Sequence, residues 1–291
     1  MEKAILIDGN SLMFRSYYGT IKQVDFFVKN NLFPTNAIKT MMLMIFRLLS
    51  ENDYQYGLIA FDSKEKNFRK QEFDDYKKQR KATPENLVVQ IEPIKQIMAY
   101  FGINVYCISG IEADDVVGSG AVLLSQNNIL CDVYSSDYDL LQLVDNNVKV
   151  FQIKKGIKEM VCYDNNNFKD LFYGLSPSQI PDFKGISGDN SDNLPGIKGI
   201  GESSAIKLLL KYASLENIFD NIDFISSQSL KTNLIENKEI GLKCKKLATI
   251  LTDYFNGAQI EKFSLKPINY AKIKEVINQY RFNGFKKYIK D

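Results

Sequence analysis

The sequence predicts an α/β protein in which a mainly parallel central sheet is flanked by helices. Three short apolar runs end in aspartate: AILID ends at Asp8, YGLIAFD ends at Asp62, and ILCDVYSSD ends at Asp137. Segments with helical periodicity lie between these runs, at residues 37–49 and 86–101. Strands that alternate with helices are typical of βαβ units, whose strands form parallel sheets.

The acids at the strand ends predict a metal site. In a parallel sheet, ligands bind outside the carboxyl ends of the strands, where Asp8, Asp62, Asp137 and the nearby Asp139 would lie. An alternative is that these aspartates cap the helices that follow them. Capping does not require acids on successive strands, so the set as a whole favours metal binding.

The segment SKEKNFRKQEFDDYKKQRKATPENL, residues 63–87, is basic and contains regularly placed aromatic residues. Lys77 and Arg80 are three apart and are expected to share a helix face, with Phe73 and Tyr76 beside them. Cations interleaved with aromatic rings are typical of a nucleic-acid groove. An exposed helix with its aromatic side chains turned to the core explains the pattern equally well.

The segment GIEADDVVGSGAVLLS, residues 110–125, is expected to form a helix that begins with three acids, Glu112, Asp114 and Asp115. The helix dipole favours acids in the first turn and explains part of this pattern. Three carboxylates within four residues repel one another, and a bound cation would relieve that repulsion. These acids and those near Asp137 therefore predict one shared metal site.

The character of the chain changes near residue 170, where we place a domain boundary. Before it, VKVFQI and KEMVCY predict a strand pair with a turn at Lys155-Gly156. After it, helices are joined by glycine-rich turns. In one such turn, GDNSDN, Asp189 and Asp192 are either local turn residues or two further metal ligands.

The segment LPGIKGIGESSAIKLLLKY, residues 194–212, predicts a phosphate-binding hairpin. Gly199 and Gly201 expose backbone N–H groups just before a predicted helix, and a helix N-terminus with free N–H groups binds anions. Lys198 and Lys207 add positive charge nearby. Because no base-reading group is evident, the contact would follow the nucleic-acid backbone, not its sequence.

Composition excludes several other classes. The chain of 291 residues is 45% hydrophobic and 25% charged, which is typical of a globular protein with a sizeable core. It has no uncharged apolar run of about 18 residues, and its N-terminal run is too short for a signal peptide, so we expect a cytoplasmic protein without a membrane segment. It contains no histidine, which excludes histidine-based catalysis and metal ligation. Its four cysteines lack the spacing of a metal site.

Six ordered motifs resemble the 5′-3′ exonucleases, the flap-endonuclease-like nucleases found in free-standing form and as the N-terminal domain of bacterial DNA polymerase I. The motifs are LIDGNSLMFRSYY, FPTNA, AFDSKEKNFRKQEFDDYKKQR, GIEADD, SSDYDLLQLV and GDNSDNLPGIKGIGESSAIKLL. The resemblance runs from about residue 4 to residue 212. It implies a PIN-like α/β nuclease core at residues 1–170 with a helical arch at about 64–100. It also implies a helical region at 171–291 with a helix-three-turn-helix element at about 185–212.

The resemblance also implies site residues. The implied metal-binding carboxylates are Asp8, Asp62, Glu112, Asp114, Asp115, Asp137, Asp139, Asp189 and Asp192. Lys77 and Arg80 are implied as catalytic cations that face the scissile phosphate. The DNA-contacting residues are expected to be Tyr17, Arg69, Tyr76, Lys198, Gly199, Gly201 and Lys207. One departure is Tyr138, which lies between two implied ligands where the family usually has a basic residue.

The implied activity is structure-selective 5′-3′ exonuclease and flap-endonuclease cleavage of DNA, in primer removal during replication and in repair. Two Mg²⁺ ions are expected in the site, with Mn²⁺ as a substitute, and K⁺ at the helix-three-turn-helix element. The expected substrates are flap, nicked, branched or 5′-ended duplex DNA and RNA primer–DNA hybrids, bound by a monomer. The chain ends at Asp291, so we expect a free-standing nuclease or an excised domain. Two rivals are a branched-DNA-binding protein that has lost its chemistry and a small-RNA ribonuclease, and the complete carboxylate set argues against the first.

Overall fold

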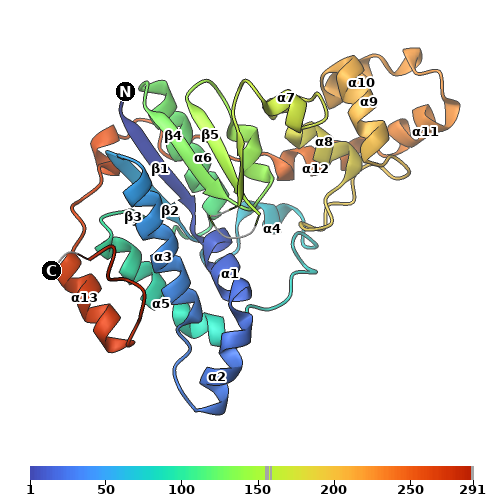
Figure 1. Ribbon diagram of the computed structural model, residues 1–291. Helices are drawn as coiled ribbons and strands as arrows, with labels where there is room; N and C mark the ends of the chain where they lie inside the picture. The colour runs from blue at the N-terminus through green and yellow to red at the C-terminus, as the bar shows by residue number, and fades with distance from the viewer. Residues whose placement is uncertain (155–156, 158, 290–291) are drawn as a thin grey trace.

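A computed structural model of the protein describes residues 1–154, 157 and 159–289. One sheet forms the centre of this part of the protein (Figure 1). Its strands are β1 (Lys3–Asp8), β2 (Tyr56–Ala60), β3 (Asn104–Tyr106), β4 (Leu130–Ser135), β5 (Val148–Ile153) and β6 (Met160–Tyr163). Their order is β3-β2-β1-β4-β5-β6, with β6 antiparallel to β5 and the other pairs parallel. The predicted α/β fold with a mainly parallel sheet is confirmed.

Helices cover both faces of the sheet because its central strands are apolar on both sides. In β1, Ile5 and Ile7 belong to one hydrophobic core and Ala4 and Leu6 to the other, and all four are fully buried. The helices of the first core are α1 (Gly9–Gly19), α3 (Asn36–Glu51), α5 (Glu85–Tyr100) and α13 (Tyr270–Gln279). The second core includes α6 (Ala113–Gln126). The short helix α2 (Val24–Lys29) extends beyond α1 (Figure 1).

A helical region lies to one side of the sheet (Figure 1). Its helices are α7 (Phe168–Leu171), α8 (Ile180–Ser187), α9 (Glu202–Tyr212), α10 (Leu215–Asp220), α11 (Gln228–Glu236) and α12 (Lys238–Ala248). Helices α8 and α12 approach closely because each has a glycine at the crossing. A Cβ on Gly185 would lie 3.0 Å from the carbonyl oxygen of Gly241, and a Cβ on Gly241 would lie 2.9 Å from Ile197. The 3₁₀ segments are Ile21–Gln23, Asp139–Leu143, Pro177–Gln179, Ile222–Phe224 and Ile260–Phe263.

Most predicted elements are confirmed. The two predicted helices correspond to α3 and α5, and the predicted strand pair corresponds to β5 and β6. The turn predicted at Lys155-Gly156 lies outside the described residues. None of the helices within the described ranges is long and apolar enough to cross a membrane.

The helix predicted around Lys77 and Arg80 is wrong. Helix α4 (Phe68–Glu72) ends before these residues, and a series of turns follows it. Lys77 has a φ of 53°, which no α-helix allows, and its N–H donates to the carbonyl oxygen of Asp192 at 2.9 Å. The backbone carbonyl of Asp75 accepts from the Asn193 amide at 2.7 Å. These long-range bonds tie the segment to the loop after α8 and outweigh its helical pattern.

Candidate active site at the carboxyl edge of the sheet

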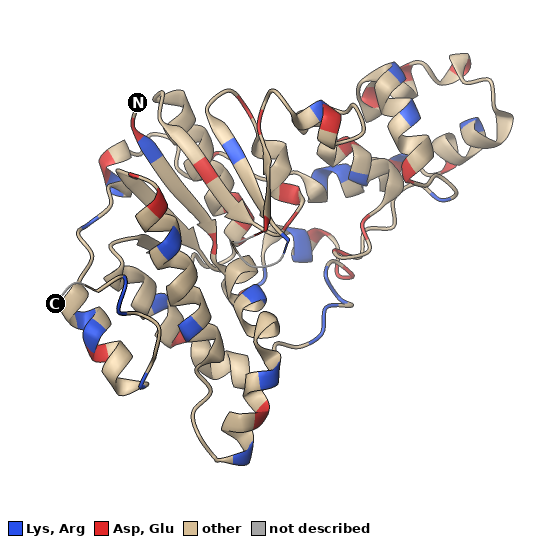
Figure 2. Ribbon diagram, in the orientation of Figure 1, with Lys and Arg blue, Asp and Glu red and all other residues tan. Residues whose placement is uncertain are grey.

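The order in which strands are added reverses at β1, and this reversal creates a crevice at the carboxyl edge of the sheet. From β1 the sheet continues through β2 on one side and through β4 on the other, which is the arrangement that places ligand sites between the diverging connections. Asp8 ends β1, Asp62 follows β2 by two residues, and Asp137 follows β4 by two residues. A cavity of about 1120 Å³ opens there. Figure 2 shows acidic residues near this edge and basic residues in the segment after α4.

Five of the predicted carboxylates line this cavity: Asp8, Asp62, Asp114, Asp137 and Asp189. The first four of these form the open group, and Asp189 belongs to a second group described below. Asp8 is also a helix cap, because its Oδ1 accepts from the N–H of Ser11 at 2.9 Å at the start of α1. Its Oδ2 accepts from the Ser135 hydroxyl at 2.7 Å. The helix cap and a place in the cavity wall are therefore compatible for Asp8, since the cap fixes the carboxylate in place.

These carboxylates destabilise one another's negative charge. Burial raises the pKa of Asp8 to about 7, and the charges of Asp137 and Asp62 contribute to the rise. Burial, followed by the charges of Asp8 and Asp137, raises the pKa of Asp114 well above its ordinary value, and burial raises that of Asp137. No lysine or arginine of the described ranges forms an ion pair with any of the four. An all-oxygen donor set with unbalanced charge fits a hard divalent cation such as Mg²⁺.

Two other predicted carboxylates are already paired with the protein's own cations. Asp115 is 1% exposed, and Arg69 donates to both of its oxygens at 2.7 Å. Glu112 accepts from Lys77 at 2.9 Å and from the Tyr76 hydroxyl at 3.2 Å. Asp115 Oδ1 also accepts from the N–H of Leu251 at 2.8 Å, and Asp115 is not among the residues that line the cavity. Its predicted role as a metal ligand is therefore not supported by this arrangement.

The expected DNA contacts of Arg69 and Tyr76 are also not supported. Each residue is 2% exposed. Arg69 donates to the carbonyls of Leu247 and Thr249, both at 2.8 Å, in addition to its carboxylate partner. The Tyr76 hydroxyl donates to Asp192 at 3.0 Å. Both side chains are internal links between the segment after α4 and the carboxylates, not surface groups.

Asp192 is held by the two cations that the sequence predicted as catalytic. Arg80 Nη2 lies 2.7 Å from Asp192 Oδ1, and Lys77 Nζ lies 3.9 Å from Oδ2. Both cations also line the cavity. Burial opposes the charge of Lys77, but Glu112 and Asp192 raise its pKa above the ordinary value, so it stays protonated. The predicted cations therefore reach the site from a turn, not from a helix face.

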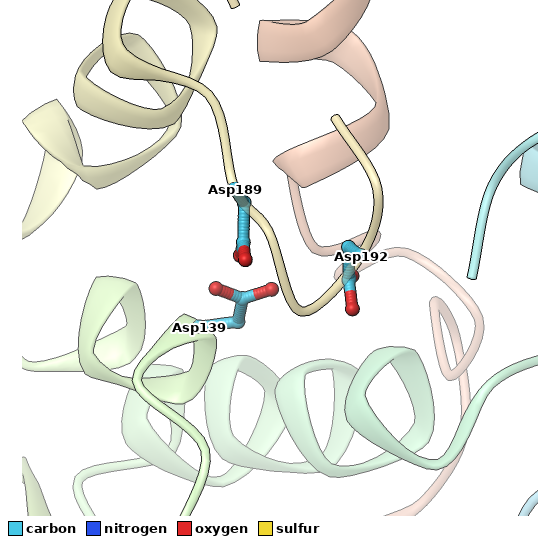
Figure 3. A group of neighbouring side chains, drawn as sticks. All are labelled: Asp139, Asp189 and Asp192. Carbon is cyan, nitrogen blue, oxygen red and sulfur yellow. The ribbon is translucent and has the colours of Figure 1, made fainter. Parts of the chain in front are cut away.

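A second acidic group comprises Asp139, Asp189 and Asp192, which offer one oxygen each within 4.8 Å of one another (Figure 3). Lys184 Nζ contacts both Asp139 and Asp189. Although burial favours the neutral acid, Lys184 and Ser191 hold the pKa of Asp189 below its ordinary value. A metal at this group would have to displace the ammonium of Lys184. Lys184 was not predicted as a site residue; it lies in α8, five residues before Asp189 and just ahead of the predicted helix-three-turn-helix element.

The predicted hairpin is present and exposed. Lys198, Gly199, Gly201 and Lys207 are all exposed. The positive φ of 80° at Gly199 requires glycine. No side chain of the described residues caps α9, which leaves its first N–H groups for an external acceptor.

Tyr17 is not placed as expected. It is 2% exposed and packs in the core between α1 and α3, whereas its neighbour Tyr18 is 54% exposed and lines the cavity. Arg15 and Lys154 line the cavity as well. An α-helix turns by about 100° per residue, so two adjacent tyrosines cannot both face the same side.

Comparison with known proteins decides the family. A family model described as the 5′-3′ exonuclease N-terminal resolvase-like domain matches residues 3–173, and one described as the 5′-3′ exonuclease C-terminal SAM fold matches residues 175–271. The chain belongs to the 5′-3′ exonuclease family. This confirms the resemblance drawn from the six motifs and the predicted enzyme class.

Several relatives support this assignment. The chain is 47% identical to the 5′-3′ exonuclease of Mycoplasma genitalium over 283 residues, which is 97% of each protein. It is 33% identical to DNA polymerase I of Bacillus subtilis, over 97% of this chain and 32% of the polymerase. In fold it is similar to the T5 5′-exonuclease with bound zinc, with a TM-score of 0.73 and 18% identity over 95% of this chain and 99% of the other. It is also similar to the T5 D15 flap endonuclease in complex with DNA and metal ions, with a TM-score of 0.70, 19% identity and coverage of 96% and 100%.

Proposed function

We propose that this member of the family hydrolyses DNA phosphodiesters in the cavity, as a structure-selective 5′-3′ exonuclease and flap endonuclease. The observation that carries the proposal is the group Asp8, Asp62, Asp114 and Asp137. Four carboxylates from separate segments share one cavity, and no cation of the described residues forms an ion pair with them. Like charges gathered in this way repel one another, and a bound cation would relieve that repulsion.

Mg²⁺ is the cation that we propose for this group, with Mn²⁺ as a substitute. When bound, Mg²⁺ acts as a Lewis acid toward the phosphodiester and lowers the pKa of a water molecule bound to it. A two-ion site, with ions about 4 Å apart in known examples, would use the second acidic group, Asp139 and Asp189. A metal ion bound there would displace the ammonium of Lys184 from Asp139 and Asp189. Asp8 is held by Ser11 and Ser135, so it can receive a cation with little rearrangement.

Lys77 and Arg80 are proposed to contact the scissile phosphate. Both side chains line the cavity and remain charged, and their present partners are carboxylates at its edge. A phosphate that enters the cavity offers them anionic oxygens in place of these carboxylates. Fixed cations at the point where charge develops stabilise the transition state. No histidine is needed as a general base in this arrangement.

The hairpin is proposed to hold the duplex away from the cut. Lys198 and Lys207 would contact phosphates together with the N-terminal N–H groups of α9, and K⁺ would bind beside them. We further propose a functional division near residue 170, between the nuclease core and the helical region that carries the hairpin. We propose that the active form is a cytoplasmic monomer that acts on DNA and on RNA primer–DNA hybrids.

The test compares Asp137→Asn with Asp253→Asn, an exposed control outside the cavity. End-labelled flap, nicked and single-stranded DNA are incubated with and without Mg²⁺, and product lengths are measured. We expect cleavage by the parent and the control, no cleavage by Asp137→Asn, and DNA binding by all three in a gel-shift assay without Mg²⁺. Cleavage by Asp137→Asn at the parental rate would overturn the site assignment.

A further inference from the structure

A smaller cavity opens beside the catalytic cavity and shares part of its wall. Its volume is about 210 Å³. Tyr138 and Phe183 line both cavities, whereas Tyr163, Phe172 and Tyr173 line only the smaller one among the described residues. We call this smaller cavity the aromatic side pocket. The rest of its wall is formed by Leu171, Ile180, Lys184 and Glu202, and the last two also line the catalytic cavity. The pocket is continuous with the place where the substrate strand is proposed to lie.

The rings of the pocket come from separate elements and stand at different angles. Phe172 stands edge-on to Phe183, with ring centroids 6.1 Å apart and an interplanar angle of 80°. The rings of Phe172 and Tyr173 have centroids 5.6 Å apart and an interplanar angle of 59°, and Tyr138 and Tyr163 complete the aromatic part of the wall. The pocket is therefore a shaped aromatic enclosure, not a flat patch.

Tyr173 ends α7 in the left-handed backbone conformation, and the N–H of Gly174 closes the helix on the carbonyl of Lys169 at 2.7 Å. Its φ is 56°, at the end of α7, where glycine or asparagine is the usual residue. The left-handed conformation costs a residue with a side chain about 1 kcal/mol. Its ring is 61% exposed, so packing offers little compensation. The exposed side chain of Tyr173 at the pocket wall is therefore accessible to a ligand.

Tyr138 stands at the boundary between the two cavities and is held there by Lys154. The Lys154 ammonium donates to the Tyr138 hydroxyl at 2.6 Å and lies 4.8 Å from the centre of its ring. The ring remains 44% exposed. A strand in the catalytic cavity would therefore pass an aromatic face, with cations from Lys154 and Lys184 nearby for its phosphates.

The size of the pocket suits a single planar ring system. A volume of about 150 Å³ is enough to hold benzene, and the pocket, at about 210 Å³, has room for a planar ring system. Nucleobases stack on aromatic side chains without regard to sequence. We propose that the aromatic side pocket takes one unpaired nucleobase of the DNA strand held in the catalytic cavity. This inference rests on the proposed function, because it requires that strand to be DNA.

The experiment uses the full chain and flap DNA that carries 2-aminopurine at successive positions around the junction, without Mg²⁺. Tyr173→Gly removes the ring and suits the positive φ, Tyr173→Phe keeps the ring, and Tyr270→Ala is a control at an exposed tyrosine on α13. We expect stacking to quench the fluorescence at one position with the parent, Tyr173→Phe and Tyr270→Ala. With Tyr173→Gly the quenching should be lost.

A second measurement replaces the base at that position by an abasic site. The parent should bind the abasic flap about five- to tenfold more weakly than the normal flap, from the lower range of base-stacking energies. Tyr173→Gly should bind both flaps equally. The inference is overturned if no position is quenched selectively, or if Tyr173→Gly behaves like Tyr270→Ala. Cleavage of the same flap with Mg²⁺ is measured in parallel, because its absence in the parent would refute the proposed function instead.

Discussion

Removing one partner of the buried pair of Arg69 and Asp115 should cost much stability and leave metal binding unchanged. Arg69 donates to both oxygens of Asp115 and to the carbonyls of Leu247 and Thr249. The change Arg69→Met leaves one buried carboxylate without its cation and two carbonyls without donors. Removing one partner of a buried ion pair costs about 3–5 kcal/mol. For a chain of this size, about 2–4 °C is lost per kcal/mol, so the Tm should fall by about 10 °C.

A double-mutant cycle separates the pair from its surroundings. Thermal and urea unfolding are measured for the parent, Arg69→Met, Asp115→Leu and the double variant. Because both charges are absent in the double variant, it should be more stable than either single variant. The role of Asp115 is tested by the rise in Tm that Mg²⁺ produces, which Asp115→Asn should retain and Asp137→Asn should lose. A loss of stability below about 1 kcal/mol in Arg69→Met, or equal loss of the Mg²⁺ response in both asparagine variants, would refute this reasoning.

Three further predictions concern the site and the hairpin. Burial raises the pKa of Asp8 to about 7, and protons compete with metal for its carboxylate. The rise in Tm on adding Mg²⁺ should therefore grow as the pH increases through about 7. An equal rise in Tm at about pH 5 would contradict this. Lys198→Ala and Lys207→Ala should each reduce the salt slope of duplex binding by about 1, measured by fluorescence anisotropy; an unchanged slope would exclude the phosphate contact. Gly196→Ala should destabilise the hairpin, since its Cβ would lie 2.2 Å from the Gly188 nitrogen; a parental Tm and duplex affinity would show that the loop adapts.

The gathering of Asp8, Asp62, Asp114 and Asp137 could be predicted from the sequence, because each of them follows a recognisable strand or begins a recognisable helix. Asp8, Asp62 and Asp137 occur after apolar runs whose strand character is local. Parallel pairing then brings their carboxyl ends to one edge, so a local pattern is enough to predict the gathering. The cavity that they line follows from topology, which the strand–helix alternation already implied.

The segment after α4 could not be predicted in the same way. Its helical spacing placed Lys77 and Arg80 on one face, yet the backbone of Lys77 bonds to Asp192, more than a hundred residues away. Helix propensity is weak compared with several long-range hydrogen bonds and ion pairs. Adjacent residues such as Tyr17 and Tyr18 presented a related limit, because only the packing of α1 decides which ring is buried.

The sequence by itself determined the family, the α/β sheet, the acids at the ends of its strands and the hairpin, because these depend on short motifs and local periodicity. Only the tertiary structure decided how the nine predicted carboxylates divide. Arg69 neutralises Asp115 across 46 residues, and Lys184 reaches Asp139 across 45. The open carboxylates near Asp8 have no such partner among the described residues. Charge pairing depends on distances of a few ångströms between remote segments, and no spacing along the chain encodes them.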